Sequence, residues 1–172
     1  MIKSHKYIIH FILLILIQLL VVNNIQVNSY VNPFMYILII LILPFDINKS
    51  LLLFLGFLTG LTIDIFSDTY GIHAAATTLL AFIRPTILNI LSSKEAYEAD
   101  TCPDINIYGF SWFLRYLIIA TFIHHTCLFF LEIFSFNNFL HTTGKIFANL
   151  ISTIIAMLFY YIIALKQANK KR

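Results

Sequence analysis

Long stretches of this sequence consist almost entirely of apolar side chains, which leaves few folds open to the chain. A helix needs about 20 predominantly apolar residues to cross the ~30 Å hydrocarbon core of a bilayer. Hydrophobic residues make up 60% of the 172 residues and charged residues only 11%, whereas about a quarter of the residues of a soluble domain are charged. We therefore expect an all-α integral membrane protein. The spans that we predict are residues 7–22, 33–45, 51–66, 72–91, 110–134 and 143–165.

These six segments occupy almost the whole chain, so the sequence predicts one transmembrane domain, residues 1–172, built as a bundle of about six helices. The second and third segments are short for spanning helices. One polar segment of note remains, residues 92–109, in which four acidic residues stand against Lys94 alone. We expect this acidic loop to be cytoplasmic, and either to contact a soluble partner or to act as a solvated connector.

Lysine and arginine residues gather on one predicted side of the membrane. The two termini carry six of them, and the connections near Lys49 and Lys94 carry one each, while residues 23–32, 67–71 and 136–142 carry none. Cationic loops stay on the cytoplasmic side of a membrane. We predict that both termini are cytoplasmic. The basic residues are thus explained by topology, and they do not indicate nucleic-acid binding.

The third predicted span combines small residues with a carboxylate. Gly56, Gly60 and Asp64 are spaced four apart, so on a helix they lie along one slowly drifting face. Two glycines at this spacing let another backbone approach closely. An aspartate inside a membrane is costly, by ~2.5 kcal/mol or more near the bilayer centre, and it usually faces protein or water. We therefore predict that this face packs against another helix.

The depth of each polar residue in the membrane indicates which of them can contact Asp64. At ~1.5 Å per residue, Asp64 lies near the external face and Arg84 much deeper, so we do not expect these two residues to pair. Lys145 is the better candidate partner. The sequence predicts an outer polar layer consisting of Asp64, Asp68, His73, Glu132, His141 and Lys145.

Arg84 and Arg115 are placed nearer the cytoplasm, where no acidic residue is obviously available. We expect both side chains to extend toward lipid phosphates, and a specific contact with a neighbour is the alternative. Pro85 should kink the fourth span next to Arg84, because it removes a helix hydrogen bond.

The sequence does not indicate an enzyme. His124 and His125 point about 100° apart on a helix, so they do not converge on a metal as histidines four residues apart would. We expect one ring to be hydrogen-bonded within the bundle. Ser111 lacks the nucleophile-elbow pattern, and no phosphate-binding glycine loop is present. Cys102 and Cys127 lie in different kinds of segment, so we expect two unpaired thiols and no metal or cofactor.

One short region resembles a known family. A span that ends Gly-x-x-x-Gly-x-x-x-Asp is followed by a serine, a tight turn and a Gly-x-His-Ala opening of the next helix. Together with the size and span layout of the whole chain, this region resembles the bacterial rod-shape-determining protein MreD family. The matching residues are Gly56, Gly60, Asp64, Ser67, Gly71, His73 and Ala74 to Ala76. The turn "SDTYG" departs from the family pattern because it has no proline and is one residue shorter.

The resemblance implies a non-enzymatic subunit of the cell-elongation machinery in the bacterial cytoplasmic membrane. It implies binding to the single-span periplasmic protein MreC, and through it a link to MreB filaments and to the glycosyltransferase and transpeptidase that make peptidoglycan. The family is also similar in fold to the substrate-binding components of energy-coupling-factor vitamin transporters, so a solute-binding transporter subunit is the alternative. Our candidates for helix packing or partner binding are Gly56, Gly60, Asp64, Ser67, Gly71, His73, Arg84, Glu132 and Lys145.

Overall fold

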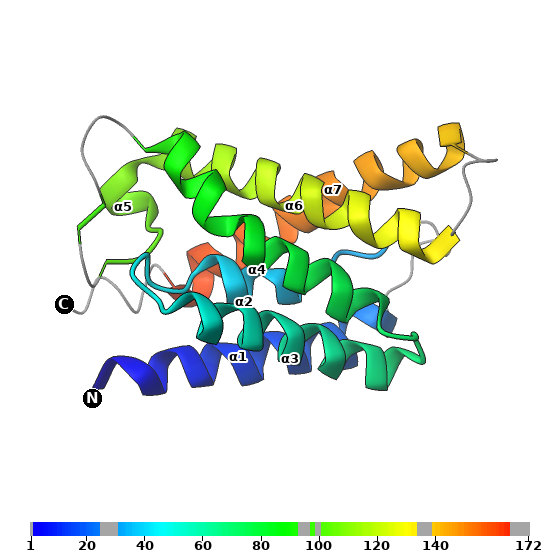
Figure 1. The fold of residues 1–172 in the computed structure, drawn as a ribbon, viewed down its shortest axis with the longest axis horizontal. Helices are drawn as coiled ribbons and strands as arrows, with labels where there is room; N and C mark the ends of the chain where they lie inside the picture. Colours follow the sequence, from blue (N-terminus) through cyan, green and yellow to red (C-terminus); the bar gives the residue numbers. More distant parts are fainter. Residues whose placement is uncertain (1, 25–30, 93–96, 99–100, 134–138, 166–172) are drawn as a thin grey trace.

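The structure is a computed structural model that describes residues 2–24, 31–92, 97–98, 101–133 and 139–165, most of them helical (Figure 1). The long helices are α1 (Ile2–Leu20), α3 (Lys49–Ser67), α4 (Ile72–Leu91), α6 (Phe110–Ile133) and α7 (Phe139–Tyr160). Within or around each of them lies a stretch that is long and apolar enough to cross a membrane. The described chain is therefore an all-helical protein of the multi-pass membrane type, and five of the six predicted spans coincide with such helices.

Short elements extend or connect the long helices. The 3₁₀-helix η1 (Val22–Asn24) continues α1, and the π-helical η3 (Tyr161–Leu165) continues α7. Helix α5 (Ile105–Tyr108) precedes α6. The ring of long helices closes between α7 and α1, where His10 Nδ1 and the Tyr160 hydroxyl lie 2.8 Å apart.

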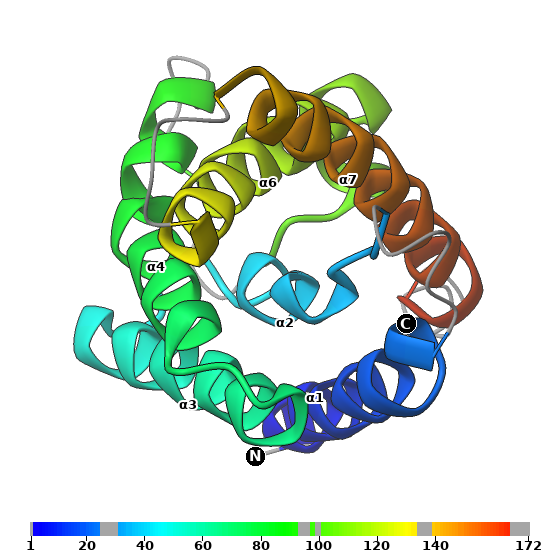
Figure 2. The same ribbon diagram turned by 90° about the vertical axis from the view of Figure 1, so that its right-hand side faces the viewer.

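The second predicted span, residues 33–45, is not a spanning helix. It contains only the 3₁₀-helix η2 (Met35–Ile37) and the four-residue α2 (Leu38–Leu41), which together rise roughly 12 Å and cannot cross the ~30 Å core. Figure 2 shows α2 in the middle of a ring formed by the five long helices. Its side chains are almost wholly buried. This piece is apolar because it is the core of the bundle, and composition alone does not separate a core segment from a lipid-facing one. We call residues 31–45 the central segment.

The central segment still carries the chain from one end of the bundle to the other. Helices α1, α3 and α6 run in one direction and α4 and α7 in the opposite one, so α1 begins and η3 ends at the same end (Figure 1). Lys49 opens α3 at this end as well. We call it the inner end, following the predicted orientation, and we call the end with the α3–α4 turn the outer end.

The two glycines of α3 pack against α4 as predicted. A Cβ atom built on Gly60 would lie 2.4 Å from the His73 carbonyl oxygen, and one on Gly56 would lie 2.8 Å from the Ala81 Cβ atom. Both distances are shorter than van der Waals contact, so only glycine allows this approach. The turn between the helices uses two left-handed residues, Asp68 (φ 52°) and Gly71 (φ 85°).

Part of the acidic loop packs against the inner end of the bundle. The Phe45 amide donates to the Thr101 carbonyl at 3.0 Å, and the Phe45 ring stacks on Tyr97 with centroids 4.2 Å apart. Asp104 is buried and accepts from the Tyr161 hydroxyl at 2.9 Å. The described residues of this loop are therefore more than a solvated connector.

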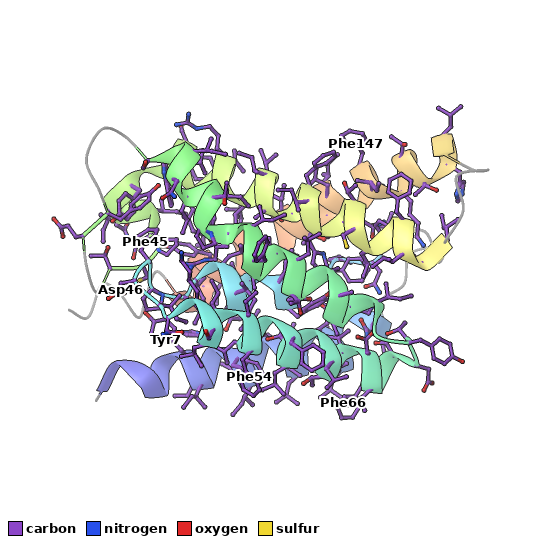
Figure 3. All side chains as sticks on the ribbon, in the orientation of Figure 1. Tyr7, Phe45, Asp46, Phe54, Phe66 and Phe147 are labelled. Atoms are coloured by element: carbon purple, nitrogen blue, oxygen red, sulfur yellow. The ribbon has the colours of Figure 1, made fainter. Side chains whose placement is uncertain are left out.

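Large apolar side chains cover the outside of the ring. Phe54 and Phe66 on α3 and Phe147 on α7 point away from the bundle (Figure 3) and are half to two-thirds exposed. Such a surface suits lipid or another membrane helix. Cys102 and Cys127 are free thiols, as expected.

Candidate functional site

Asp64 is bound by the first turn of α4. One carboxylate oxygen accepts from the Thr69 hydroxyl and from the His73 amide at 3.1 Å, and the other accepts from the Ala74 amide at 2.8 Å. The side chain is only 3% exposed. The first amide groups of a helix have no partner inside the helix and carry partial positive charge, so a carboxylate there is doubly stabilised.

This arrangement corrects the expected partner of Asp64. Lys145 instead binds Glu132, with its Nζ atom 3.0 Å from each carboxylate oxygen, and it lies over the Phe129 ring at 4.7 Å. The charge of Asp64 is satisfied within its own hairpin. The residues of the MreD-like region thus form one local unit: the glycines admit α4, and Asp64 caps it.

A chain of hydrogen bonds runs behind this cap. The Tyr36 hydroxyl lies 2.8 Å from His73 Nδ1 and 3.0 Å from His124 Nε2. His124 Nδ1 lies 3.2 Å from His125 Nδ1, and His125 Nε2 lies 3.1 Å from the Thr153 hydroxyl. The chain joins the central segment to α4, α6 and α7. A neutral imidazole has one N–H donor and one acceptor nitrogen. If every ring is neutral, all hydrogen bonds of the chain therefore run either from His73 toward Thr153 or from Thr153 toward His73.

Both of the adjacent histidines are hydrogen-bonded in the bundle, where we expected only one to be. The two rings are fully buried. Among the described residues, no group of three or more His, Cys, Asp or Glu side chains could hold a metal ion.

Neutral side chains fix the outer part of the central segment. The Phe34 amide donates to the Thr153 hydroxyl at 3.0 Å, and the Met35 amide donates to Gln18 Oε1 at 2.8 Å. Gln18 Nε2 in turn donates to the Pro33 carbonyl at 3.0 Å. These contacts supply partners to backbone groups that would otherwise be unpaired in a water-free interior.

Arg84 fixes the inner part of the central segment. Its side chain is 1% exposed, so it does not extend to lipid phosphates, and the alternative of a specific contact is the one observed. The guanidinium donates to the carbonyl oxygens of Leu43 and Pro44. It also donates from Nε to the Tyr116 hydroxyl at 2.9 Å, which itself donates to the Leu41 carbonyl at 3.2 Å. Leu43 and Pro44 follow the C-terminal end of α2, so Arg84 supplies hydrogen-bond donors to carbonyl oxygens outside that helix.

Arg115 differs from Arg84. It is exposed, and its Nε atom donates to the Ser111 carbonyl at 3.2 Å one helical turn earlier. Its position is compatible with the expected contact to lipid headgroups.

A cavity of about 440 Å³ opens at the outer end. Four members of the predicted outer layer line it, namely Asp68, His73, Glu132 and Lys145. Asp64 and His141 do not. The apolar part of its lining includes Phe34, Ile63 and Leu128. Ser67 also lines the cavity and accepts from Asn23 Nδ2 at 3.3 Å.

Several residues that build these anchors were not singled out from the sequence. They are Gln18, Tyr36, Tyr116, Thr153 and Asn149, whose Oδ1 atom accepts from the Asn32 amide at 2.7 Å. Each is a neutral polar residue inside an apolar segment, and such residues commonly hydrogen-bond between membrane helices. A survey of uncharged polar residues in the spans would have found them, but not their partners.

Comparisons of this chain with protein-family models, with curated proteins and with solved structures found no match.

Proposed function

We propose that this chain is a non-enzymatic subunit of the bacterial cell-elongation machinery, which supports cell shape and peptidoglycan synthesis by binding an MreC-like single-span protein. The proposal places it in the cytoplasmic membrane with both termini cytoplasmic. MreB filaments, the glycosyltransferase and the transpeptidase would be reached through this complex.

One observation carries the proposal: most residues of the MreD-like region, namely Gly56, Gly60, Asp64, His73 and Ala74, join α3 to the first turns of α4. Gly60 meets the backbone of His73 and Ala74, and the amides of these two residues are bound by Asp64. The described hydrogen bonds of the buried charges Asp64 and Arg84 are also made mainly to backbone groups of the protein itself. Such bonds favour a structural role for the two side chains over a role in proton transfer.

We expect the partner helix to pack on the side of the α3–α4 hairpin that points away from the centre of the bundle. An apolar groove there has small side chains at its outer part on α4, namely Ala74, Ala75 and Thr78. Its other lining residues include Leu79 and Phe82 on α4 and Leu53, Phe57 and Leu61 on α3. Small residues let a second membrane helix approach closely. Binding at this face would place the partner against the unit that the resemblance identifies.

Co-purification tests the proposal. Ala75 is exposed in the groove, so Ala75→Phe should fill it and reduce recovery of the cell's MreC-like protein, with a wider cell as the consequence. Ile155→Phe is the matched control, because Ile155 is 63% exposed on α7, away from the groove. Equal recovery with both variants would remove the groove from the proposal, and no recovery with the wild type would remove the scaffold role.

The outer cavity favours a second candidate, a small-solute-binding subunit of a vitamin-type transporter. Its volume of about 440 Å³ is within the range of ~300–1,000 Å³ typical of ligand pockets. Mass spectrometry of the purified protein separates the two functions. A tightly retained vitamin-like molecule would support the transporter subunit and count against the scaffold.

A further inference from the structure

Another hollow opens on the side of the bundle, between α1 and α3, which are neighbours in the ring (Figure 2). It has a volume of about 280 Å³, and its lining surface is apolar throughout. We call this hollow the lateral crevice. Its lining residues are Tyr7, Ile8 and Phe11 on α1, Leu55 and Leu58 on α3, and Ile39, Ile42 and Leu43 of the central segment.

The lateral crevice leads through the ring of helices to the core. Its lips are exposed, at 53% for Ile8 and 37% for Leu58. Its floor is the central segment, where Ile39 and Ile42 are only 4% and 5% exposed. A lipid chain that lies on the outside of the ring touches the lips but not the floor. An occupant of the crevice is therefore distinguishable from the lipid that surrounds the bundle.

The depth and the apolar lining of the crevice select its occupant. At ~1.5 Å per residue, Leu55 and Leu58 lie roughly 9 and 14 Å along α3 from Lys49. In a hydrocarbon core ~30 Å thick, this is the depth of the acyl chains of the leaflet at the inner end. Apolar cavities stay dry, and an empty one lacks the dispersion contacts that a filling chain would make. The occupant that fits is therefore a hydrocarbon chain.

Cationic residues predominate at the inner ends of the two helices that form the crevice. Lys3 and Lys6 belong to the first two turns of α1, and Lys49 begins α3. Lys3 precedes Tyr7 by four residues, so the two positions share one face of α1. Asp46, three residues before α3 begins, is the acidic residue close to them in the sequence. Three cations against one carboxylate favour an anionic headgroup.

We propose that the lateral crevice binds one acyl chain of an anionic phospholipid, such as phosphatidylglycerol, whose phosphate lies at the inner ends of α1 and α3. The chain fills the hollow and covers the apolar floor. A zwitterionic lipid such as phosphatidylcholine is disfavoured, because it would bring a cationic group to three lysines. A membrane helix of another protein is about 10 Å wide and would cover the lips without reaching the floor.

Photolabelling in a bilayer tests the proposal. The full chain is placed in nanodiscs of phosphatidylcholine that contain a small fraction of phosphatidylglycerol with a diazirine on one acyl chain. Illumination expels nitrogen, and the resulting carbene inserts into neighbouring C–H bonds. We expect mass spectrometry to find the label on Ile39, Ile42 or Leu43. The same diazirine chain on phosphatidylcholine should label these floor residues about fivefold less, since each nearby lysine attracts an anionic headgroup.

Two lip variants and one matched control locate the chain. Leu58→Trp and Ile8→Trp place a larger side chain on opposite lips. Each should lower the labelling of the floor by about tenfold, because the indole competes with the lipid chain for the same space. Ile155→Trp, on α7 and 63% exposed, should leave the labelling unchanged. Size-exclusion chromatography checks that each variant folds, and either lip variant suffices for the test.

Charge variants locate the headgroup. Lys3→Gln combined with Lys49→Gln should remove the preference for phosphatidylglycerol over phosphatidylcholine. Arg115→Gln removes an exposed cation from α6 and should keep it. If Arg115→Gln removes the preference as well, the charge of the whole inner end attracts the lipid and the proposed headgroup position is wrong.

The proposal is overturned if the label stays on outward-facing residues, which would mean that the crevice is empty or is covered by a protein helix. It is also overturned if phosphatidylcholine labels the floor as strongly as phosphatidylglycerol, or if the folded lip variants are labelled like the wild type. It does not depend on the scaffold role, because MreC-like co-purification is measured separately.

Discussion

The two ends of the central segment are held in different ways. At the outer end, several neutral groups share the task, among them Gln18, Tyr36 and Thr153. At the inner end, one buried cation, Arg84, binds two backbone carbonyls and Tyr116. Replacing one residue of the outer network removes only some of the hydrogen bonds that hold this end. Replacing Arg84 removes all of its hydrogen bonds to the inner end at once. The comparison predicts unequal sensitivity of the two ends.

Arg84→Met should destabilise the protein most. It leaves the Leu43 and Pro44 carbonyls without the donor that Arg84 provides, and we expect a loss of about 3 kcal/mol or more in the free energy of unfolding, because an unpaired buried polar group costs ~1–3 kcal/mol. Unfolding with dodecyl sulfate in mixed micelles measures it. Arg115→Met is the control and should stay within about 0.5 kcal/mol, because Arg115 is exposed. Equal losses would refute the single-anchor view.

Asp64→Asn tests another buried charge of the bundle, which caps α4 and does not bind the central segment. An amide replaces one carboxylate oxygen with a donor that faces an N–H or O–H group of Thr69, His73 or Ala74. We expect a loss of about 1–3 kcal/mol in the same unfolding measurement. Asp68→Asn, at an exposed turn position, should change stability by less than about 0.5 kcal/mol. If Asp64→Asn costs as much as Arg84→Met, the anchor at the inner end is no more sensitive than the cap of α4.

Tyr36→Phe probes the neutral network directly. The hydroxyl that bridges His73 and His124 is lost, but backbone contacts to Gln18 and Thr153 remain. We expect a loss of about 1–3 kcal/mol, because the buried ring nitrogens of His73 and His124 lose their partner. Tyr70→Phe is the matched control, because Tyr70 is fully exposed. A loss above that of Asp64→Asn would mean that the network acts as one unit.

Lys145→Met should have the smallest effect. The Lys145–Glu132 pair is partly exposed, at 20% and 47% of the two side chains, and such pairs contribute only ~0.2–1 kcal/mol. The same unfolding assay, repeated at high salt, should show an even smaller difference from the wild type, since salt screens exposed charges. A loss that is large and independent of salt would show that the pair stabilises the bundle from within.

Local pattern sufficed for much of the fold and for part of the site. The packing of the Gly56, Gly60 and Asp64 face against a helix followed from the sequence, because a four-residue spacing sets one helix face wherever the helix lies. That this helix is α4 did not follow from the sequence. The difference in membrane depth correctly predicted that Asp64 and Arg84 do not pair. The partners of both charges were missed, because each is bound mainly by backbone groups, and every residue type offers the same backbone groups. A sequence does not show which amide or carbonyl is left without a partner.

Apolar run length fixed the helical class and the positions of five long helices, since a bilayer dictates how much hydrophobic chain a span requires. Whether residues 33–45 face lipid or fill the core depended on packing. The ring of α1, α3, α4, α6 and α7 leaves room for a segment at its centre, and a segment there is apolar for the same reason as one in lipid: neither is in contact with water. Contacts between distant residues then determined that Arg84 lies inside the bundle, and that Asp68, His73, Glu132 and Lys145 surround one cavity.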